Sequence, residues 1–339
     1  MFTYKTLVRI DPSILKDEVE NLRKSYIALD PTFELRKSKE PQYSEIRSAF
    51  SRFNNLNHFY QRLMQMETPK NNIPIKEKRS DGTLVIEVVA SAKGNSARIY
   101  FKPSVTSLTK EVRKAIKPID DNNVFVYFDL KAAEFALRCI QAQDNEALKV
   151  YYEGGDIYMA KAHLFPQGTE RPLIKKTLIA SMYGRTAYST AKDLGISETQ
   201  AQRLLDNIDR NFTKLTMLKR SIVLKDKKQG AYYSPDGFDQ THLIKVADIN
   251  PAKGFDPNLA WSAWTQSALG FIMQKFSTMY LNHQKDSKKT FLSIFDSVVA
   301  EVSKENVVRF QDYCSRAFSP LLPDGFHQGS TMYEALYEN

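Results

Sequence analysis

Three short runs of β-branched and aromatic residues stand out in a chain whose other segments mostly have helical spacing. They are TLVIEVVA (83–90), NVFVYFDL (123–130) and TFLSIFDSVVAEV (290–302). Runs of this length and composition are typical of strands in a sheet. The third run is interrupted at Asp296-Ser297, where a hairpin turn fits. We therefore expect a fold that mixes strands with helices.

Helical spacing dominates the rest of the chain. Residues 12–67 place apolar residues at helical intervals, and residues 131–282 are again mostly helical, with YYSPDGFDQ (232–240) as the clearest turn. Residues 68–82 mix Pro, Asn and Gly with charges, which is typical of an exposed linker. The pattern predicts four segments, 1–82, 83–150, 151–255 and 256–339.

Composition favours a polyanionic partner. The 339 residues carry 48 Lys and Arg against 39 Asp and Glu, a net charge of +9, which suits nucleic acid. Cys139 and Cys314 each lie in an apolar stretch, so we expect core thiols rather than disulfides, as in a reducing cytosol. No apolar run approaches the roughly 18 residues of a membrane span. A soluble, intracellular protein is expected.

Two aspartates adjoin the strand-like runs. Asp129 ends one run and precedes a helical pattern, where it is either a ligand for a hard cation or a helix cap. Asp296 lies between LSIF and VVAEV, where it is either a second ligand or an ordinary turn residue. If the two strands are neighbours, the carboxylates meet, and paired carboxylates can position two Mg²⁺ ions for phosphoryl transfer.

A stripe of four side chains recurs every four residues between these acids. Its members are Arg171, Lys175, Ile179 and Tyr183. On a helix they share one face, which suits a nucleoside triphosphate because cations meet phosphates and apolar groups meet sugar and base. An amphipathic helix with a solvated basic end is the alternative. Pro172 fits the first turn of this helix and Gly184 a break after it.

These segments resemble, in order, motifs A, B and C of family A DNA polymerases and their single-subunit RNA polymerase relatives. FDLKAAEFALR is similar to motif A, with Asp129 as metal ligand and Glu134 five residues later. R-x3-K-x7-YG, from Arg171 to Gly184, is similar to motif B, and IFDSVVAEV to motif C, with Asp296 as the second ligand. The similarity extends over about residues 95–305.

The resemblance implies an α+β fold, that of a right-hand polymerase with an antiparallel palm sheet and helical fingers. The thumb would be a reduced helical region at 1–82, the palm would comprise 83–150 and 256–339, and the fingers 151–255. An exonuclease domain is not expected. The implied partners are primer-template DNA and dNTPs, together with a processivity or replication protein, and no membrane.

The implied activity is template-directed addition of dNTPs to a primer 3′-hydroxyl, with release of pyrophosphate. Asp129, Asp296 and the Leu130 carbonyl would hold two Mg²⁺ ions, for which Mn²⁺ can substitute. Arg171 and Lys175 would neutralise phosphates, and Lys175 would protonate the pyrophosphate. The resemblance places Leu130, Glu134, Ile179 and Tyr183 at the nucleotide, and Arg98, Gly184 and Gln266 at the primer-template.

Departures from the family pattern leave the product open. Motif C usually reads HDE, whereas this chain has Phe295-Asp296-Ser297, and Ile179 is nearer the Met of RNA polymerases. Glu134 is typical of the DNA branch, where it rejects a 2′-hydroxyl. A primer-independent RNA polymerase or primase is therefore an alternative. So is a non-catalytic nucleic-acid-binding protein, which the retained acids and Lys175 disfavour.

One further departure concerns motif A. The Arg usually found two positions after the Glu is replaced by Ala136, and Arg138 stands two positions further on. The role of the family's Arg is therefore either lost or relocated in this chain.

Overall fold

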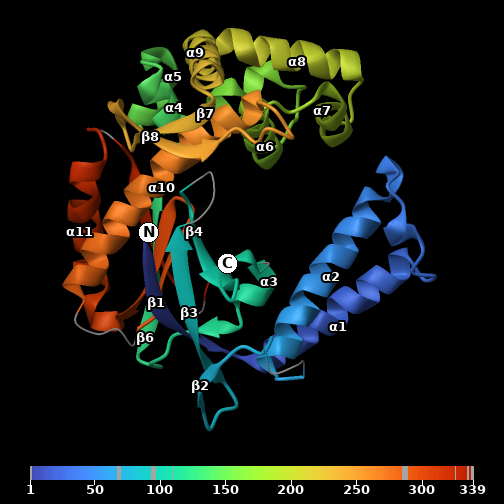
Figure 1. Cartoon of the computed structure of the whole chain (residues 1–339), viewed down its shortest axis with the longest axis vertical. Helices are drawn as coiled ribbons and strands as arrows, with labels where there is room; N and C mark the ends of the chain where they lie inside the picture. The colour runs from blue at the N-terminus through green and yellow to red at the C-terminus, as the bar shows by residue number, and fades with distance from the viewer. Residues whose placement is uncertain are drawn as a thin grey trace.

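Two antiparallel sheets form the body of the protein in a computed structural model (Figure 1). The model describes residues 2–66, 70–92, 97–108, 110–284, 289–324, 326–333 and 336. In the first sheet the order is β2 (Ile75–Lys78), β3 (Leu84–Ala92), β1 (Thr3–Ile10) and β5 (Ile116–Lys117), and β4 (Ile99–Lys102) also pairs with β3. In the second the order is β11 (Gln328–Tyr333), β6 (Asn123–Leu130), β10 (Ser297–Ser303) and β9 (Phe291–Ile294).

Helices gather at one end of the second sheet, at the top of Figure 1. They are α4 (Ala133–Gln141), α5 (Asn145–Tyr152), α6 (Arg171–Met182), α7 (Ala187–Leu194), α8 (Glu198–Asn211) and α9 (Thr213–Gln229), accompanied by the hairpin of β7 (Ala231–Asp236) and β8 (Asp239–Asp248). The long helix α10 (Pro257–His283) leads from this group along the sheet beside α11 (Val307–Phe318).

A helical hairpin projects from the side of the molecule opposite α11 in Figure 1. It consists of α1 (Pro12–Leu29) and α2 (Ser44–Leu63), and the short helix α3 (Lys110–Arg113) lies near its base. The chain enters the hairpin directly from β1, which ends at Ile10. The hairpin is therefore attached to the edge of the body through the first sheet.

The second sheet lies between two hydrophobic cores, because its strands alternate. On β6, Val124, Val126, Phe128 and Leu130 face the core that contains α4, α10 and α11. Phe125 instead belongs to the core shared with the first sheet. Successive residues of a strand point to opposite faces, so Asp129 lies on the same face as Phe125. Its carboxylate is thereby directed away from the helical core.

The helical core confirms the assignment of the two cysteines. Cys139 and Cys314 are both buried and unpaired in it. α10 is apolar on all sides and is accordingly buried along most of its length. Its Phe276 stacks on Phe318 of α11 with ring centroids 4.0 Å apart. Among the described residues, no helix combines the length and apolar character that crossing a membrane requires.

The predicted strands at 83–90, 123–130 and 290–302 are confirmed as β3, β6 and the β9–β10 hairpin. The turn of that hairpin is Phe295-Asp296, one residue earlier than expected, and Ser297 is already in β10. The helices predicted within 12–67 are confirmed as α1 and α2, but the description of 1–82 as helical is incomplete, because β1 and β2 lie within it. Both strands pair with β3, so sheet pairing decides their conformation.

The two sheets are joined by side-chain hydrogen bonds between β1 and β9. The Phe291 N–H donates to the Thr6 hydroxyl oxygen over 2.9 Å, and the Ser293 N–H donates to the Tyr4 hydroxyl over 3.3 Å. Thr6 is buried, so these bonds replace a backbone ladder between the sheets.

Thr6→Val should lower the free energy of unfolding by about 1–3 kcal/mol, because the buried Phe291 N–H loses its acceptor. Urea denaturation followed by circular dichroism measures this difference. Thr278→Val, which removes a hydroxyl bond on an exposed turn of α10, is the matched control and should change stability by less than about 0.5 kcal/mol. Equal effects of the two variants would contradict the role of Thr6.

Candidate active site

Strand pairing brings the two aspartates together. Asp129 near the end of β6 lies opposite Ser297, the first residue of β10. Asp296 precedes Ser297 in the hairpin turn, and its carbonyl accepts a hydrogen bond from the Leu130 N–H over 3.1 Å. Asp129 is not a helix cap, because α4 begins only at Ala133 and Ala132 holds the cap position. The two acids are therefore neighbours on one sheet edge.

Burial and a neighbouring acid disfavour the charged form of each carboxylate. Burial, and then the negative charge of Asp296, raise the pKa of Asp129 to about 7. Burial raises the pKa of Asp296 to about 6, with Glu134 adding to the effect. The charge of Lys175 acts in the opposite direction on both. A divalent cation between these groups would relieve both effects. Within the described ranges no cluster of three acidic, His or Cys ligands occurs.

Helix α6 presents the predicted stripe beside this pair. It begins at Arg171 with Pro172 in its first turn, and Tyr183 is its C-terminal cap. Lys175 lines two cavities. One, of about 360 Å³, also contains Asp129 and Arg171. The other, of about 1030 Å³, contains Ile179 and Tyr183. The stripe therefore runs from the acid pair toward the end of α6.

Two residues of the first cavity were not singled out by the sequence patterns. Asp156 forms an ion pair with Arg171, which holds the pKa of Asp156 below its usual value against the opposing effect of burial. The buried Tyr158 ring lies 5.6 Å from the Arg171 guanidinium carbon and 5.5 Å from Lys175 Nζ. Both residues belong to the stretch EGGDIYMAK, which resembles the family. That resemblance is the sequence signal by which they could have been found.

Glu134 is the centre of a hydrogen-bonded group. Its Oε2 accepts a bond from the Tyr183 hydroxyl over 2.7 Å, and its Oε1 accepts one from Arg98 over 2.9 Å. Gln266 Nε2 lies 3.5 Å from the Tyr183 oxygen. Arg98, Glu134 and Gln266 line a cavity of about 300 Å³ together with Asp296. Three separate segments thus converge next to the acid pair.

The contacts of Leu130 and Gly184 do not test their predicted roles, which stay predictions. Leu130 is buried, with its N–H bonded to Asp296. Gly184 has a φ of +82°, which favours glycine, and an added Cβ would collide with the Asn258 side chain. Ser297, where the family has an acid, donates its hydroxyl to the Ile294 carbonyl over 2.7 Å. That hydroxyl serves the hairpin turn.

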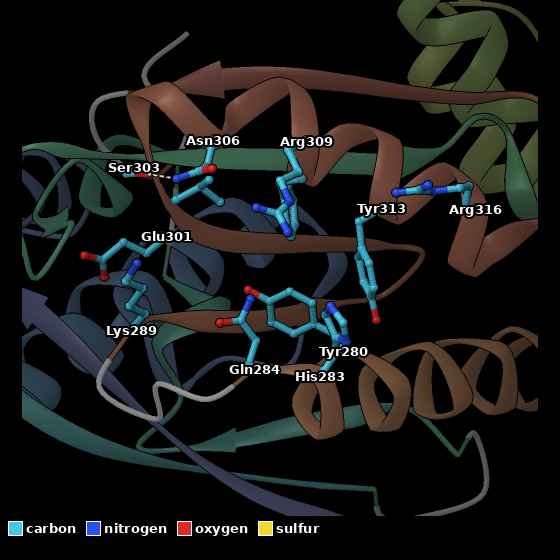
Figure 2. Close-up of a pocket in the computed structure, with 12 residues that line it drawn as sticks. Tyr280, His283, Gln284, Lys289, Glu301, Ser303, Asn306, Arg309, Tyr313 and Arg316 are labelled. Carbon is cyan, nitrogen blue, oxygen red and sulfur yellow. Dashed lines mark hydrogen bonds between the residues drawn. The ribbon is translucent and has the colours of Figure 1, made fainter.

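A separate pocket of about 340 Å³ lies at the opposite end of β10 (Figure 2). In Figure 2, Arg309 and Tyr313 of α11 extend toward Tyr280 of α10. Among the described residues that line the pocket, the acid is Glu301, which accepts hydrogen bonds from the Asp120 and Thr290 N–H groups and from the Asn123 amide. Glu301 is five positions along the chain from Asp296, which corresponds to about 17 Å of strand. No predicted site residue lines it.

Asp129→Asn should stabilise the metal-free protein at pH 8. The folded-state pKa is raised, so the penalty for ionising Asp129 is present above about pH 7 and disappears as the pH falls toward 4. We expect a gain of about 2–4 kcal/mol in unfolding free energy at pH 8 and little gain at pH 4.5, measured by denaturation in a chelator. Asp312→Asn, on an exposed position of α11, is the control. A gain that does not depend on pH would contradict this account.

Comparison with known proteins agrees with this geometry. The family model described as DNA polymerase family A matches residues 71–320. The DNA polymerase of Mycobacterium phage D29 is 23% identical over 124 residues, covering 35% of this chain and 20% of that protein. DNA polymerase I of Bacillus caldotenax is 21% identical over 244 residues, covering 67% of this chain and 28% of that protein. The chain thus spans less than a third of the length of either relative.

The fold matches a solved polymerase structure. The POL domain of Pol1 from M. smegmatis, in complex with DNA primer-template and dNTP, superimposes with a TM-score of 0.68 at 12% identity. The match covers 97% of this chain and 67% of that one. The predicted mixture of helices and antiparallel sheet is therefore confirmed as the fold of such a domain. Because the family model covers most of the chain, including all three predicted motifs, this protein belongs to DNA polymerase family A.

Proposed function

We propose that the protein is a DNA-directed DNA polymerase that adds dNTPs to a primer 3′-hydroxyl and releases pyrophosphate. The observation that carries the proposal is the adjacent pair Asp129 and Asp296, whose pKa values both respond to the charge of Lys175. An acid pair faced by cations on one helix matches the charges of a metal-bound triphosphate. Membership of the family supports the same reaction.

The residues present fit a site for two Mg²⁺ ions. Both carboxylates are half-buried, and burial together with a neighbouring acid raises the pKa of each, so they are oxygen ligands suited to a hard cation. Asp129, Asp296 and the Leu130 carbonyl would hold the ions. When bound, the ions supply Lewis-acid stabilisation of the attacking and leaving oxygens. Mn²⁺ has the same ligand preferences and can substitute.

The cations of α6 handle the triphosphate in this proposal. Arg171 exchanges its ion pair with Asp156 for phosphate oxygens. Lys175, exposed in both cavities, neutralises the β and γ phosphates and donates a proton to the leaving pyrophosphate. The Tyr158 ring lies close to both cations and limits where the phosphates can bind. Ile179 and Tyr183 pack against the sugar and base.

The three structural regions would then form a right-hand polymerase. The two sheets with α10 and α11 would be the palm, the α4–α9 group with the β7–β8 hairpin the fingers, and the α1–α2 hairpin a reduced thumb. Arg98, Gly184 and Gln266 would contact the primer-template. Because the thumb is only one helical hairpin, we also propose that a processivity partner helps to hold DNA.

Glu134 favours deoxyribonucleotides over the alternative of RNA synthesis. Both of its oxygens are fixed, by Tyr183 and Arg98, so the acid is held beside the acid pair and does not turn freely into solvent. A fixed carboxylate next to the sugar leaves no space for a 2′-hydroxyl. Ile179 and Ser297 resemble the RNA polymerase branch, and they keep ribonucleotide use as the second candidate.

Asp296→Asn should abolish primer extension with dNTPs while leaving duplex binding nearly unchanged, because the variant loses a metal ligand but no phosphate contact. Rapid-quench extension and fluorescence anisotropy of labelled primer-template measure the two properties. Asp239→Asn, at the exposed first residue of β8, is the control and should extend normally. Extension by Asp296→Asn at the wild-type rate would sink the proposal.

Glu134→Ala should increase the use of rNTPs relative to dNTPs by at least about tenfold in kcat/KM, because the group that excludes the 2′-hydroxyl is removed. Single-nucleotide extension with matched dNTP and rNTP gives the ratio. Running the same reactions on unprimed template tests the RNA polymerase or primase candidate. A wild-type enzyme that prefers rNTPs, or starts chains without a primer, would favour that second candidate.

A further inference from the structure

A buried arginine lies behind the nucleotide-facing residues. Arg138 on α4 has no exposed surface, and it forms no ion pair with a carboxylate of the described residues. Its Nε donates to the Thr265 hydroxyl over 3.0 Å, and its Nη1 lies 3.2 Å from Met182 Sδ. Its Nη2 has no hydrogen-bond partner within the part of the chain that the structure describes.

Aromatic rings take the place of a carboxylate partner. The Arg138 guanidinium carbon lies 4.2 Å from the centroid of the Tyr183 ring and 5.0 Å from that of Trp261. A desolvated guanidinium over an aromatic face gains cation–π attraction, but a buried unpaired charge remains expensive. An apolar side chain of the same length would fill this volume at lower cost. Packing alone therefore does not explain why this position carries a charged side chain.

The geometry links Arg138 to Glu134 through Tyr183. Glu134 and Arg138 are four residues apart on α4 and share one face of the helix. The Tyr183 ring lies against the guanidinium of Arg138, and its hydroxyl donates to the carboxylate of Glu134 over 2.7 Å. One tyrosine thus connects a buried cation with an acid in the candidate site. Removing the cation frees the ring while leaving its hydroxyl intact.

Arg138 also joins three helices at this point. Its own helix is α4, Met182 and Tyr183 end α6, and Thr265 belongs to α10. The end of α6 is also held by Lys219, whose Nζ donates to the Met182 carbonyl over 3.3 Å, and Gly184 follows with a positive φ. The contacts of Arg138 therefore help to fix the end of the helix that carries the predicted triphosphate stripe.

We infer that Arg138 is a positioning residue for sugar selection: its guanidinium holds the Tyr183 ring, and the ring holds Glu134 where a 2′-hydroxyl would be. This inference rests on the proposed polymerase activity. It also gives a role to Arg138 in place of the arginine of the family pattern. That arginine would stand two positions earlier, where this chain has the buried Ala136.

The test compares sugar discrimination in Arg138→Met and Arg138→Lys. The Met variant keeps an unbranched apolar stem but loses the charged guanidinium, and the Lys variant keeps the charge but loses the planar stack. In single-nucleotide extension, Arg138→Met should lower the ratio of kcat/KM for dNTP over rNTP by about tenfold. The change should come mainly from KM, since no reacting atom is touched. Arg138→Lys should give an intermediate loss.

Two controls separate positioning from general destabilisation. Arg9→Met removes another buried arginine. Arg9 lies on β1 of the first sheet and pairs with Asp81 and Asp121. This substitution should lower thermal stability and leave the dNTP over rNTP ratio unchanged. In the double variant Glu134→Ala with Arg138→Met, the arginine change should have no further effect on the ratio, because the residue it positions is already gone.

The outcomes distinguish this inference from the proposed function. Folded Arg138→Met with a wild-type ratio, alongside a lowered ratio for Glu134→Ala, would overturn the inference and leave the polymerase proposal standing. If Arg138→Met does not fold, Arg138→Lys decides by the same ratio, and an unchanged value overturns the inference. Additive effects in the double variant would also overturn it. A wild-type protein that extends no primer would remove both proposals.

Discussion

The antiparallel pairing of β6 with β10 is the constraint on which the site depends. It aligns Asp129 with Ser297 and so places Asp296, the preceding turn residue, beside the end of β6. The two acids are 167 positions apart in the sequence, so no local contact could bring them together. A one-residue slip in register would turn Asp129 to the opposite face. The apolar residues that alternate along β6 hold this register against two separate cores.

The site is built at a cost to the metal-free fold. Burial and the charge of a neighbouring acid raise the pKa values of Asp129 and Asp296 to about 7 and about 6, and Arg138 is buried without an ion-pair partner among the described residues. Each of these charges is unfavourable alone. In the proposed reaction the two acids bind metal ions, and Arg138 is stabilised by the ring of Tyr183. Functional sites commonly carry such local conflicts, which the rest of the fold must offset.

The sequence predicted the elements that have a strong local signal. The strand composition around Asp129 and Asp296, the four-residue repeat of α6 and the unpaired cysteines all have the expected positions. β1 and β2 were not predicted; in the structure both pair with β3, and β1 also pairs with β5. Tyr158, Asp156 and the contact between Arg138 and Tyr183 could not be derived, since they join segments whose approach depends on how α4, α6 and α10 pack. Local patterns name chemical groups, whereas packing decides which of them meet.

The central claim is that Asp129 and Asp296 together hold the ions that carry the reaction. The most direct measurement is anomalous diffraction from Mn²⁺ in crystals of the protein with a dideoxy-terminated primer-template and the next dNTP. The account predicts Mn²⁺ bound by carboxylate oxygens of both residues, at about 2.1 Å for a hard cation, and next to the triphosphate. Ions held by other acids, with Asp129 or Asp296 turned away from them, would contradict it.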